Sequence, residues 1–177
     1  MVCFSAGNGQ FGFPAGHPDV LAVGGVHVDY DPNSPTLDFE ASSYASSFDS
    51  SFYPGRHVPD FCGLVGREVA GTAPLIMLPV QPNSVLDLPN TGATDDGWGI
   101  FSGTSAACPQ VAGVVALLLG HDPSLTFSDI RDILRDSAWD VTTGTSAMGD
   151  PAGPGPDAAT GAGLVDAREA WATLTGL

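Results

Sequence analysis

Short apolar runs alternate with polar stretches in the first part of the chain. Residues 2–6 and 20–28 are almost wholly apolar, and the second run is rich in β-branched residues. Runs of this length are typical of strands that are buried on both faces, as in parallel sheets. Shorter strands are predicted at 61–65 and 75–80, and the polar stretches between these runs are predicted as loops: 31–58 and 81–98.

Helical spacing takes over near residue 104. Three helices are predicted, at 104–120, 126–137 and 166–174. The first is a run of small and apolar residues that ends at Gly120, a plausible C-terminal stop. The second opens with Thr126 and Asp129, whose Thr-x-x-Asp spacing resembles a capping box. Strands followed by helices favour an α/β fold.

The strongly acidic composition of the chain argues against nucleic acid as a partner. The chain has 177 residues, enough for one domain, and 20 acidic residues stand against five arginines and no lysine, a net charge of −15. Nucleic acid binding requires clustered cations, so it is not expected. The longest wholly apolar run, 114–119, is too short to span a bilayer, and the first residues show no secretory signal pattern.

Cysteine usage does not indicate a metal site or a disulfide framework. Cys3, Cys62 and Cys108 are odd in number and contain no CxxC pair. We expect small buried thiols.

Two short stretches carry candidate chemistry. Ser105 stands at the start of the first predicted helix, where free N–H groups favour the negative charge that forms beside a nucleophilic serine. A serine in this place is also a common helix N-cap. Asn8 follows the first strand on a glycine-rich turn, where its carboxamide either donates a hydrogen bond to a reacting group or stabilises the turn. Together the two residues supply half of a serine hydrolase site.

Four segments resemble the subtilisin-like serine proteases, and they occur in the order found in that family. They are Gly103–Gly113 (GTSAACPQVAG), Ala6–Asn8 (AGN), Phe13–Gly24 (FPAGHPDVLAVG) and Gly161–Ala167 (GAGLVDA). The resemblance covers nearly the whole chain. It implies a subtilisin-like three-layer α/β fold with a mainly parallel sheet, of which residues 1–177 form the C-terminal part, and a hydrolase that cleaves peptide bonds.

The resemblance also implies roles for individual residues. Ser105 would be the nucleophile, and Asn8 would donate its side-chain amide to the oxyanion. Substrate binding would fall to the turn around Asn8: Ser5, Ala6, Gly7, Gly9 and Gly12. This turn carries no acidic residue, so we expect a neutral pocket for apolar or aromatic side chains. No cofactor is required. Four acidic residues in loops could bind calcium, although loop acids without ligand spacing are usually just solvated. They are Asp29, Asp31, Asp95 and Asp96.

One departure from the family is serious. In subtilases the catalytic residues occur along the chain in the order Asp, His, the oxyanion Asn and Ser. Here only seven residues precede Asn8, and none of them is Asp or His. The four histidines all follow Asn8, so none takes the role of the base. His27 is expected as a strand residue, His17 as a turn residue, and His121 just past a helix end.

We therefore expect residues 1–177 to be the C-terminal portion of a subtilase catalytic domain that is inactive alone. Residues 31–100 would be irregular, with an insert possible in 44–98. The expected partners are a polypeptide substrate and an upstream segment or chain that bears the Asp and His. Two alternatives stay open, a non-catalytic binding module and one half of a split protease. By family resemblance the protein would be extracellular or at the cell surface.

Overall fold

The computed structural model describes residues 1–29, 37–67, 76–84, 87 and 96–177. Its helices and strands run in chain order: β1 (Cys3–Ser5), β2 (Leu21–Asp29), β3 (Asp38–Ala41), β4 (Phe48–Asp49), β5 (His57–Val58), β6 (Phe61–Leu64), β7 (Ile76–Pro79), β8 (Trp98–Phe101), α1 (Thr104–His121), α2 (Phe127–Asp136) and α3 (Ala167–Thr175).

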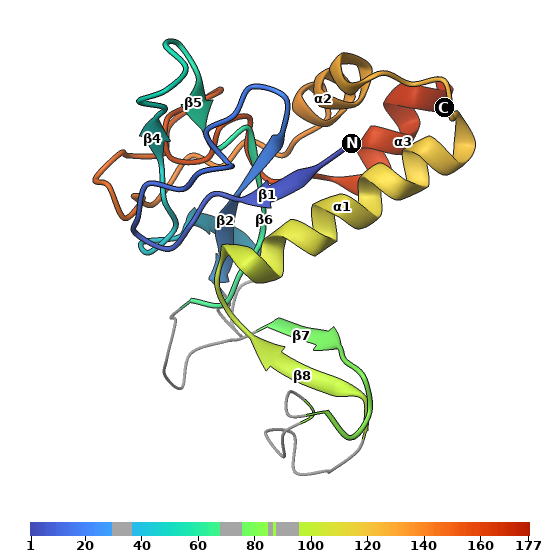
Figure 1. The fold of residues 1–177 in the computed structure, drawn as a ribbon, viewed down its shortest axis with the longest axis horizontal. Helices are drawn as coiled ribbons and strands as arrows, with labels where there is room; N and C mark the ends of the chain where they lie inside the picture. The colour runs from blue at the N-terminus through green and yellow to red at the C-terminus, as the bar shows by residue number, and fades with distance from the viewer. Residues whose placement is uncertain (30–36, 68–75, 85–86, 88–95) are drawn as a thin grey trace.

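The main sheet is built around β2. β1 and β6 pair with β2 in parallel, and β3 pairs with it antiparallel (Figure 1). Residues 21–27 are all buried, as expected for a strand that is covered on both faces. The prediction of an α/β fold with a mainly parallel sheet is confirmed.

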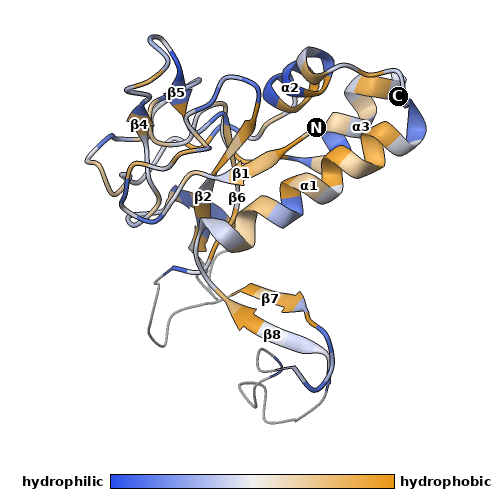
Figure 2. Cartoon of the chain, viewed as in Figure 1, coloured by the Kyte–Doolittle hydropathy of each residue, from blue (hydrophilic) through white to orange (hydrophobic). Residues whose placement is uncertain are grey.

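Helix α1 packs across β1, β2 and β6, and most of α1 and β1 has the colour of hydrophobic residues in Figure 2. Apolar side chains of α1 meet those of the strands in the main core. Gly63 lets the helix approach β6 closely, because a Cβ atom added there would lie 2.8 Å from the Ala107 carbonyl oxygen. The core joins one sheet face to three helices through these buried residues: Leu21, Val23, Phe61, Val111, Val115, Leu118, Ile130, Leu134 and Ala170. The packing fixes the start of α1 relative to the sheet.

By length and composition alone, α1 could also cross a membrane, a test that core helices of soluble proteins pass too. In this structure it packs on three strands. The expectation that the protein does not bind a membrane is tested by neither observation and stays a prediction.

Local sequence determines where the other two helices begin. The capping box at α2 is present, with the Thr126 hydroxyl accepting from Asp129 N–H and the Asp129 carboxylate accepting from Thr126 N–H. The Thr126 hydroxyl also donates to the Asp129 carboxylate at 2.6 Å, and this bond, together with the one from Thr126 N–H, lowers the pKa of Asp129. Asp166 caps α3 by accepting from the first-turn N–H groups, and Gly176 ends it in the left-handed conformation, with φ of 70°.

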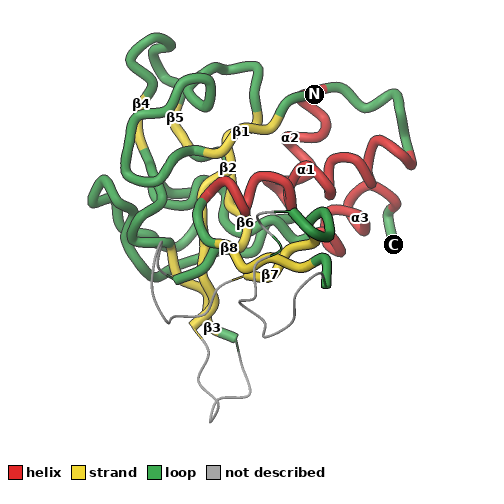
Figure 3. The backbone as a smooth tube through the Cα atoms, turned by 60° about the horizontal axis from the view of Figure 1, so that its bottom comes forward, coloured by secondary structure: helices red, strands yellow, loops and turns green. Residues whose placement is uncertain are grey.

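The region predicted as mostly loop contains more strand than expected. β3, β4 and β5 lie within 31–58, and β8 pairs with β7 in a hairpin that projects from the body (Figure 1). These strands have two to four residues, so pairing with distant partners decides them and local pattern does not. Loops surround β4 and β5, whereas the helices gather on the other side (Figure 3). Residues 30–36, 68–75, 85–86 and 88–95 lie outside the described residues, and three of these ranges fall within the possible insert at 44–98.

Candidate active site

Ser105 lies exposed in the first turn of α1. The N-cap is Gly103, with φ of 99°, and it makes no side-chain cap. The N-cap alternative for Ser105 is therefore wrong. Its hydroxyl makes no hydrogen bond with the described residues. Of the neighbouring N–H groups, that of Thr104 donates to Asn8 Oδ1 and that of Ala106 donates to the Gly103 carbonyl at 2.9 Å, whereas the N–H of Ser105 itself has no acceptor among the described residues. The Ser105 side chain is therefore accessible to solvent.

Asn8 is held beside this helix start by Thr104. The Asn8 Oδ1 atom accepts from Thr104 N–H at 3.0 Å and from Thr104 Oγ1 at 3.0 Å. Thr104 Oγ1 in turn accepts from the Gly7 N–H at 3.2 Å. The structure thus brings together Asn8 and Ser105, which lie 97 positions apart in the sequence. Because Oδ1 is engaged twice, the Asn8 amide is fixed with Nδ2 available as a donor.

Gly103 completes this arrangement. A Cβ atom added there would lie 3.1 Å from Asn8 Nδ2, so the glycine leaves room for the amide. Its N–H donates to the Tyr44 hydroxyl at 2.9 Å, and that hydroxyl donates to the Gly66 carbonyl at 2.7 Å. Tyr44 therefore anchors the start of α1.

The glycine-rich turn after Asn8 is organised by Ser46. The Ser46 hydroxyl accepts from the N–H groups of Gly9 (2.9 Å) and Gln10 (3.0 Å) and donates to the Gln10 carbonyl (2.8 Å). The Ser46 N–H also donates to the Gly7 carbonyl, at 2.9 Å. Ser46 thereby holds the main chain of the turn in one shape.

The remaining predicted substrate-binding residues differ in access. Ser5 is half-buried at the end of β1. Gly12 lies close to the Ala6 backbone, because a Cβ atom added at Gly12 would lie 3.0 Å from the Ala6 carbonyl oxygen. Ala6 is fully buried against Phe48, so its side chain supports the turn from below and cannot touch a substrate. Gly9 is exposed.

The sequence profile of the subtilase family matches residues 1–163. The chain belongs to the subtilase family. The members of this family to which it is similar are serine peptidases, and the fold described above agrees with theirs.

Curated relatives match this subtilase chain over about three quarters of its length. A calcium-dependent protease of Trichormus variabilis is 29% identical over 146 residues, covering 77% of this chain and 19% of that protein. Serine protease AprX of Bacillus subtilis is 29% identical over 142 residues, covering 77% and 29%. The chain thus spans less than a third of the length of these relatives.

A solved structure extends the likeness to the fold. Fervidolysin from Fervidobacterium pennivorans, a keratinolytic enzyme related to subtilisin, superposes with a TM-score of 0.68 at 27% identity. The match covers 96% of this subtilase chain and 22% of fervidolysin.

No histidine in the described part of the chain hydrogen-bonds to Ser105. Each contacts other groups: His17 accepts from Asp19 N–H, His27 pairs with Glu40 at 3.2 Å, His57 bonds Asp49 and the Ala158 carbonyl, and His121 packs on Trp171. His27 is a buried strand residue and His17 a turn residue, as predicted. Helix α1 ends at His121 and not at Gly120, so His121 is the last helical residue, whereas the sequence predicted it just past the helix end.

The cysteines do not compete with Ser105 as nucleophiles. Burial raises the pKa of the Cys108 thiol, one turn further along α1, to about 11, and burial also raises the pKa values of Cys3 and Cys62. A thiol must ionise to act as a nucleophile. All three thiols are therefore protonated at neutral pH.

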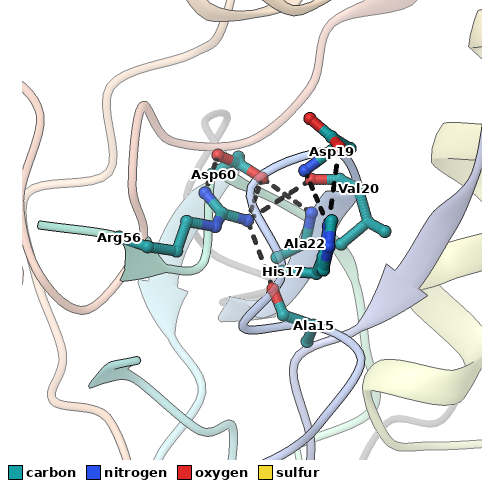
Figure 4. A network of polar contacts seen from close by, with 7 residues as sticks. All are labelled: Ala15, His17, Asp19, Val20, Ala22, Arg56 and Asp60. Atoms are coloured by element: carbon teal, nitrogen blue, oxygen red, sulfur yellow. Dashed lines mark hydrogen bonds and ion pairs between the residues drawn. The ribbon is translucent and has the colours of Figure 1, made fainter. Parts of the chain in front are cut away.

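An ion pair whose side chains are only 11% and 12% exposed supports the segment that leads from the turn into β2 (Figure 4). Arg56 pairs with Asp60 and also donates from Nη2 to the carbonyls of Ala15 (3.3 Å) and Val20 (3.4 Å). Asp60 accepts from the Ala22 N–H at 2.7 Å. The pair ties the segment to β2 and β6. It borders a cavity of about 700 Å³ that contains neither Ser105 nor Asn8.

The described residues contain no group of three His, Cys, Asp or Glu side chains that could hold a metal ion. Asp31 and Asp95 lie outside the described residues, and Asp96 accepts from the Trp98 N–H at 2.9 Å. Calcium binding stays a prediction, because calcium also binds carbonyl oxygens and water.

Proposed function

We propose that this chain carries the nucleophile and an oxyanion donor of a serine endopeptidase, Ser105 and Asn8. The observation that supports this most is the pair of hydrogen bonds from Thr104, which hold Asn8 beside the first turn of α1. Donors that are fixed before the reaction stabilise developing charge without reorganisation.

The proposed reaction is acyl transfer. Ser105 Oγ attacks a peptide carbonyl and gives its proton to a base, while the Asn8 amide and the backbone N–H of Ser105 bind the oxyanion. The base then protonates the leaving amine, and the acyl group stays on Ser105 until water releases it.

The base is the missing component. We infer that a His and its Asp partner come from a segment or chain outside residues 1–177, because the family order places both before Asn8. Without a base Ser105 Oγ remains a weak nucleophile, and the isolated chain would be a poor peptidase. A segment of the same polypeptide is the first reading, and a separate chain, as in a split protease, is the alternative.

A non-catalytic binding module is the second candidate function. It is supported by the lack of a histidine bound to Ser105 among the described residues. The retained hydroxyl and the fixed amide of Asn8 favour the peptidase, since a module free of catalysis needs neither.

Polypeptides are the proposed substrates. Gly9 and Gly12 leave the main chain of the turn open, and the turn holds no charge, so a neutral side chain is expected next to the scissile bond. The net charge of −15 disfavours nucleic acid. Extracellular location and calcium stay predictions, the latter because two relatives are named calcium-dependent proteases.

Peptide hydrolysis tests the proposal. The chain would be preceded by an Asp- and His-bearing subtilase segment, and Ser105→Ala would be compared with Ser102→Ala, a neighbouring serine with no proposed role. We expect cleavage that Ser105→Ala abolishes and Ser102→Ala retains. Cleavage that survives Ser105→Ala would contradict the role of Ser105, and a preference for Arg or Lys before the scissile bond would contradict the neutral pocket.

A further inference from the structure

Four phenylalanines surround a small cavity beside the turn. The cavity has a volume of about 110 Å³ and is walled by Phe11, Phe13, Phe48 and Phe52. Phe11 meets Phe48 edge to face with centroids 5.4 Å apart, and Phe13 meets Phe52 in the same way at 6.3 Å. We name this group the aromatic pocket.

Three of these rings are mostly in solvent. The exposed fractions are 75% for Phe11, 66% for Phe13 and 74% for Phe52. A group of exposed apolar side chains on a soluble protein marks a site of interaction. Burying apolar ring surface is favourable, and these rings are not buried in the protein alone. A ligand that covers them would therefore form a complex stabilised by that burial.

The base of the pocket is rigid. Phe48 is buried among Ala6, Ala15 and Val58, so its ring is held in place. Gly16 closes the floor, since a Cβ atom added there would lie 3.0 Å from Ser50 Oγ. The pocket is therefore a fixed apolar hollow with an open mouth.

The aromatic pocket adjoins the turn that follows Asn8, because Gly12, a proposed substrate-binding residue of that turn, is one of its lining residues. Phe11 follows Asn8 by three residues in the same turn, whose main chain Ser46 holds through Gly9 and Gln10. Anything bound against Phe11 thus lies beside the segment that positions the oxyanion donor.

We propose that the aromatic pocket binds one aromatic or branched aliphatic side chain of a polypeptide substrate. This rests on the proposed peptidase function and adds a second apolar contact to the turn of Gly7, Gly9 and Gly12. The pocket, at about 110 Å³, is somewhat smaller than a dry cavity of about 150 Å³ that holds benzene, but its mouth is open, so it has room for no more than one side chain, part of which would protrude. The carboxylate of Asp49 at the rim disfavours acidic side chains.

A binding experiment on the isolated chain tests the proposal. N-acetyl-L-phenylalaninamide is titrated while the phenylalanine ring signals are followed by NMR. We expect saturable shifts of the Phe11, Phe48 and Phe52 rings, and much weaker binding of N-acetyl-L-glutamic acid amide. Loss of one ring wall in Phe52→Ala should weaken binding about fivefold. Leu117→Ala removes another exposed apolar side chain, 64% exposed, from α1 and should leave binding unchanged.

The outcomes separate this proposal from the peptidase. The absence of saturable shifts, or equal affinity in Phe52→Ala and the parent, would overturn the pocket and leave the role of Ser105 standing, because the assay involves no catalysis. Retained probe binding with no peptide cleavage in the extended protein would contradict the peptidase and not the pocket.

Discussion

Thr104 joins the two halves of the candidate site, so replacing its hydroxyl has a calculable effect. Thr104→Val keeps the shape of the fully buried side chain but removes the hydrogen bonds to Gly7 N–H and Asn8 Oδ1. Each hydrogen bond contributes about 0.5–1.5 kcal/mol, and a buried N–H left unpaired costs about 1–3 kcal/mol. Since Gly7 is buried, we expect the free energy of unfolding to fall by about 2–4 kcal/mol.

Urea unfolding of the isolated chain measures this change without requiring catalysis. Thr143→Val is the matched control, because its hydroxyl donates one exposed hydrogen bond, to the Phe39 carbonyl at 3.1 Å, and should cost less than about 0.5 kcal/mol. The side-chain NH₂ signals of Asn8 should also move in Thr104→Val and not in the control. Equal losses in the two variants, with unchanged Asn8 signals, would refute the idea that Thr104 fixes the amide.

Four further predictions concern single features. In subtilisin itself, loss of one oxyanion donor costs about 10²–10³ in kcat; we expect Asn8→Ala to lower kcat of the base-complete protein by the same order with little change in KM. Arg56→Ala leaves the mostly buried Asp60 without its partner and should cost about 3–5 kcal/mol in urea unfolding, whereas a loss below about 1 kcal/mol would mean that the pair is solvated. Gly103→Ala forces a side chain into a backbone with φ of 99° and against the Asn8 amide, so it should lower the unfolding free energy by about 1–3 kcal/mol, and unchanged stability would contradict this. Iodoacetamide labelling of Cys108 should be slow at pH 7 and rise up to about pH 11; a plateau below pH 9 would contradict the raised pKa.

Features set by local pattern could be predicted from the sequence. The apolar, β-branched run at 20–28 forms the buried central strand β2, and Thr126 with Asp129 makes the capping box that starts α2. In both cases the signal lies within a few neighbouring residues. For β2 it is a run of apolar residues that suits a strand buried on both faces, and for α2 it is the pair of reciprocal hydrogen bonds between Thr126 and Asp129. Ser105 and Asn8 were recognised for a different reason, because their neighbouring residues resemble family motifs.

The residues that position the site could not be predicted in this way. Ser46 binds a turn 36 residues away, and it stands in a serine-rich stretch without periodicity. Tyr44 anchors Gly103 across 59 positions. Thr104 had one usable signal, a hydroxyl directly before the candidate nucleophile. The short strand β8 likewise depends on pairing with β7 and not on its own four residues.

We propose that Ser105 is a nucleophile whose base lies outside residues 1–177. The rate of Ser105 labelling by a fluorophosphonate, with the site identified by mass spectrometry, tests it most directly. In subtilisin, loss of the base alone costs about 10⁶ in kcat. We predict that labelling of the isolated chain is slower, by about 10³-fold or more, than labelling of the chain preceded by an Asp- and His-bearing segment. Equally rapid labelling of the isolated chain at Ser105, or no labelling in either form, would contradict the account.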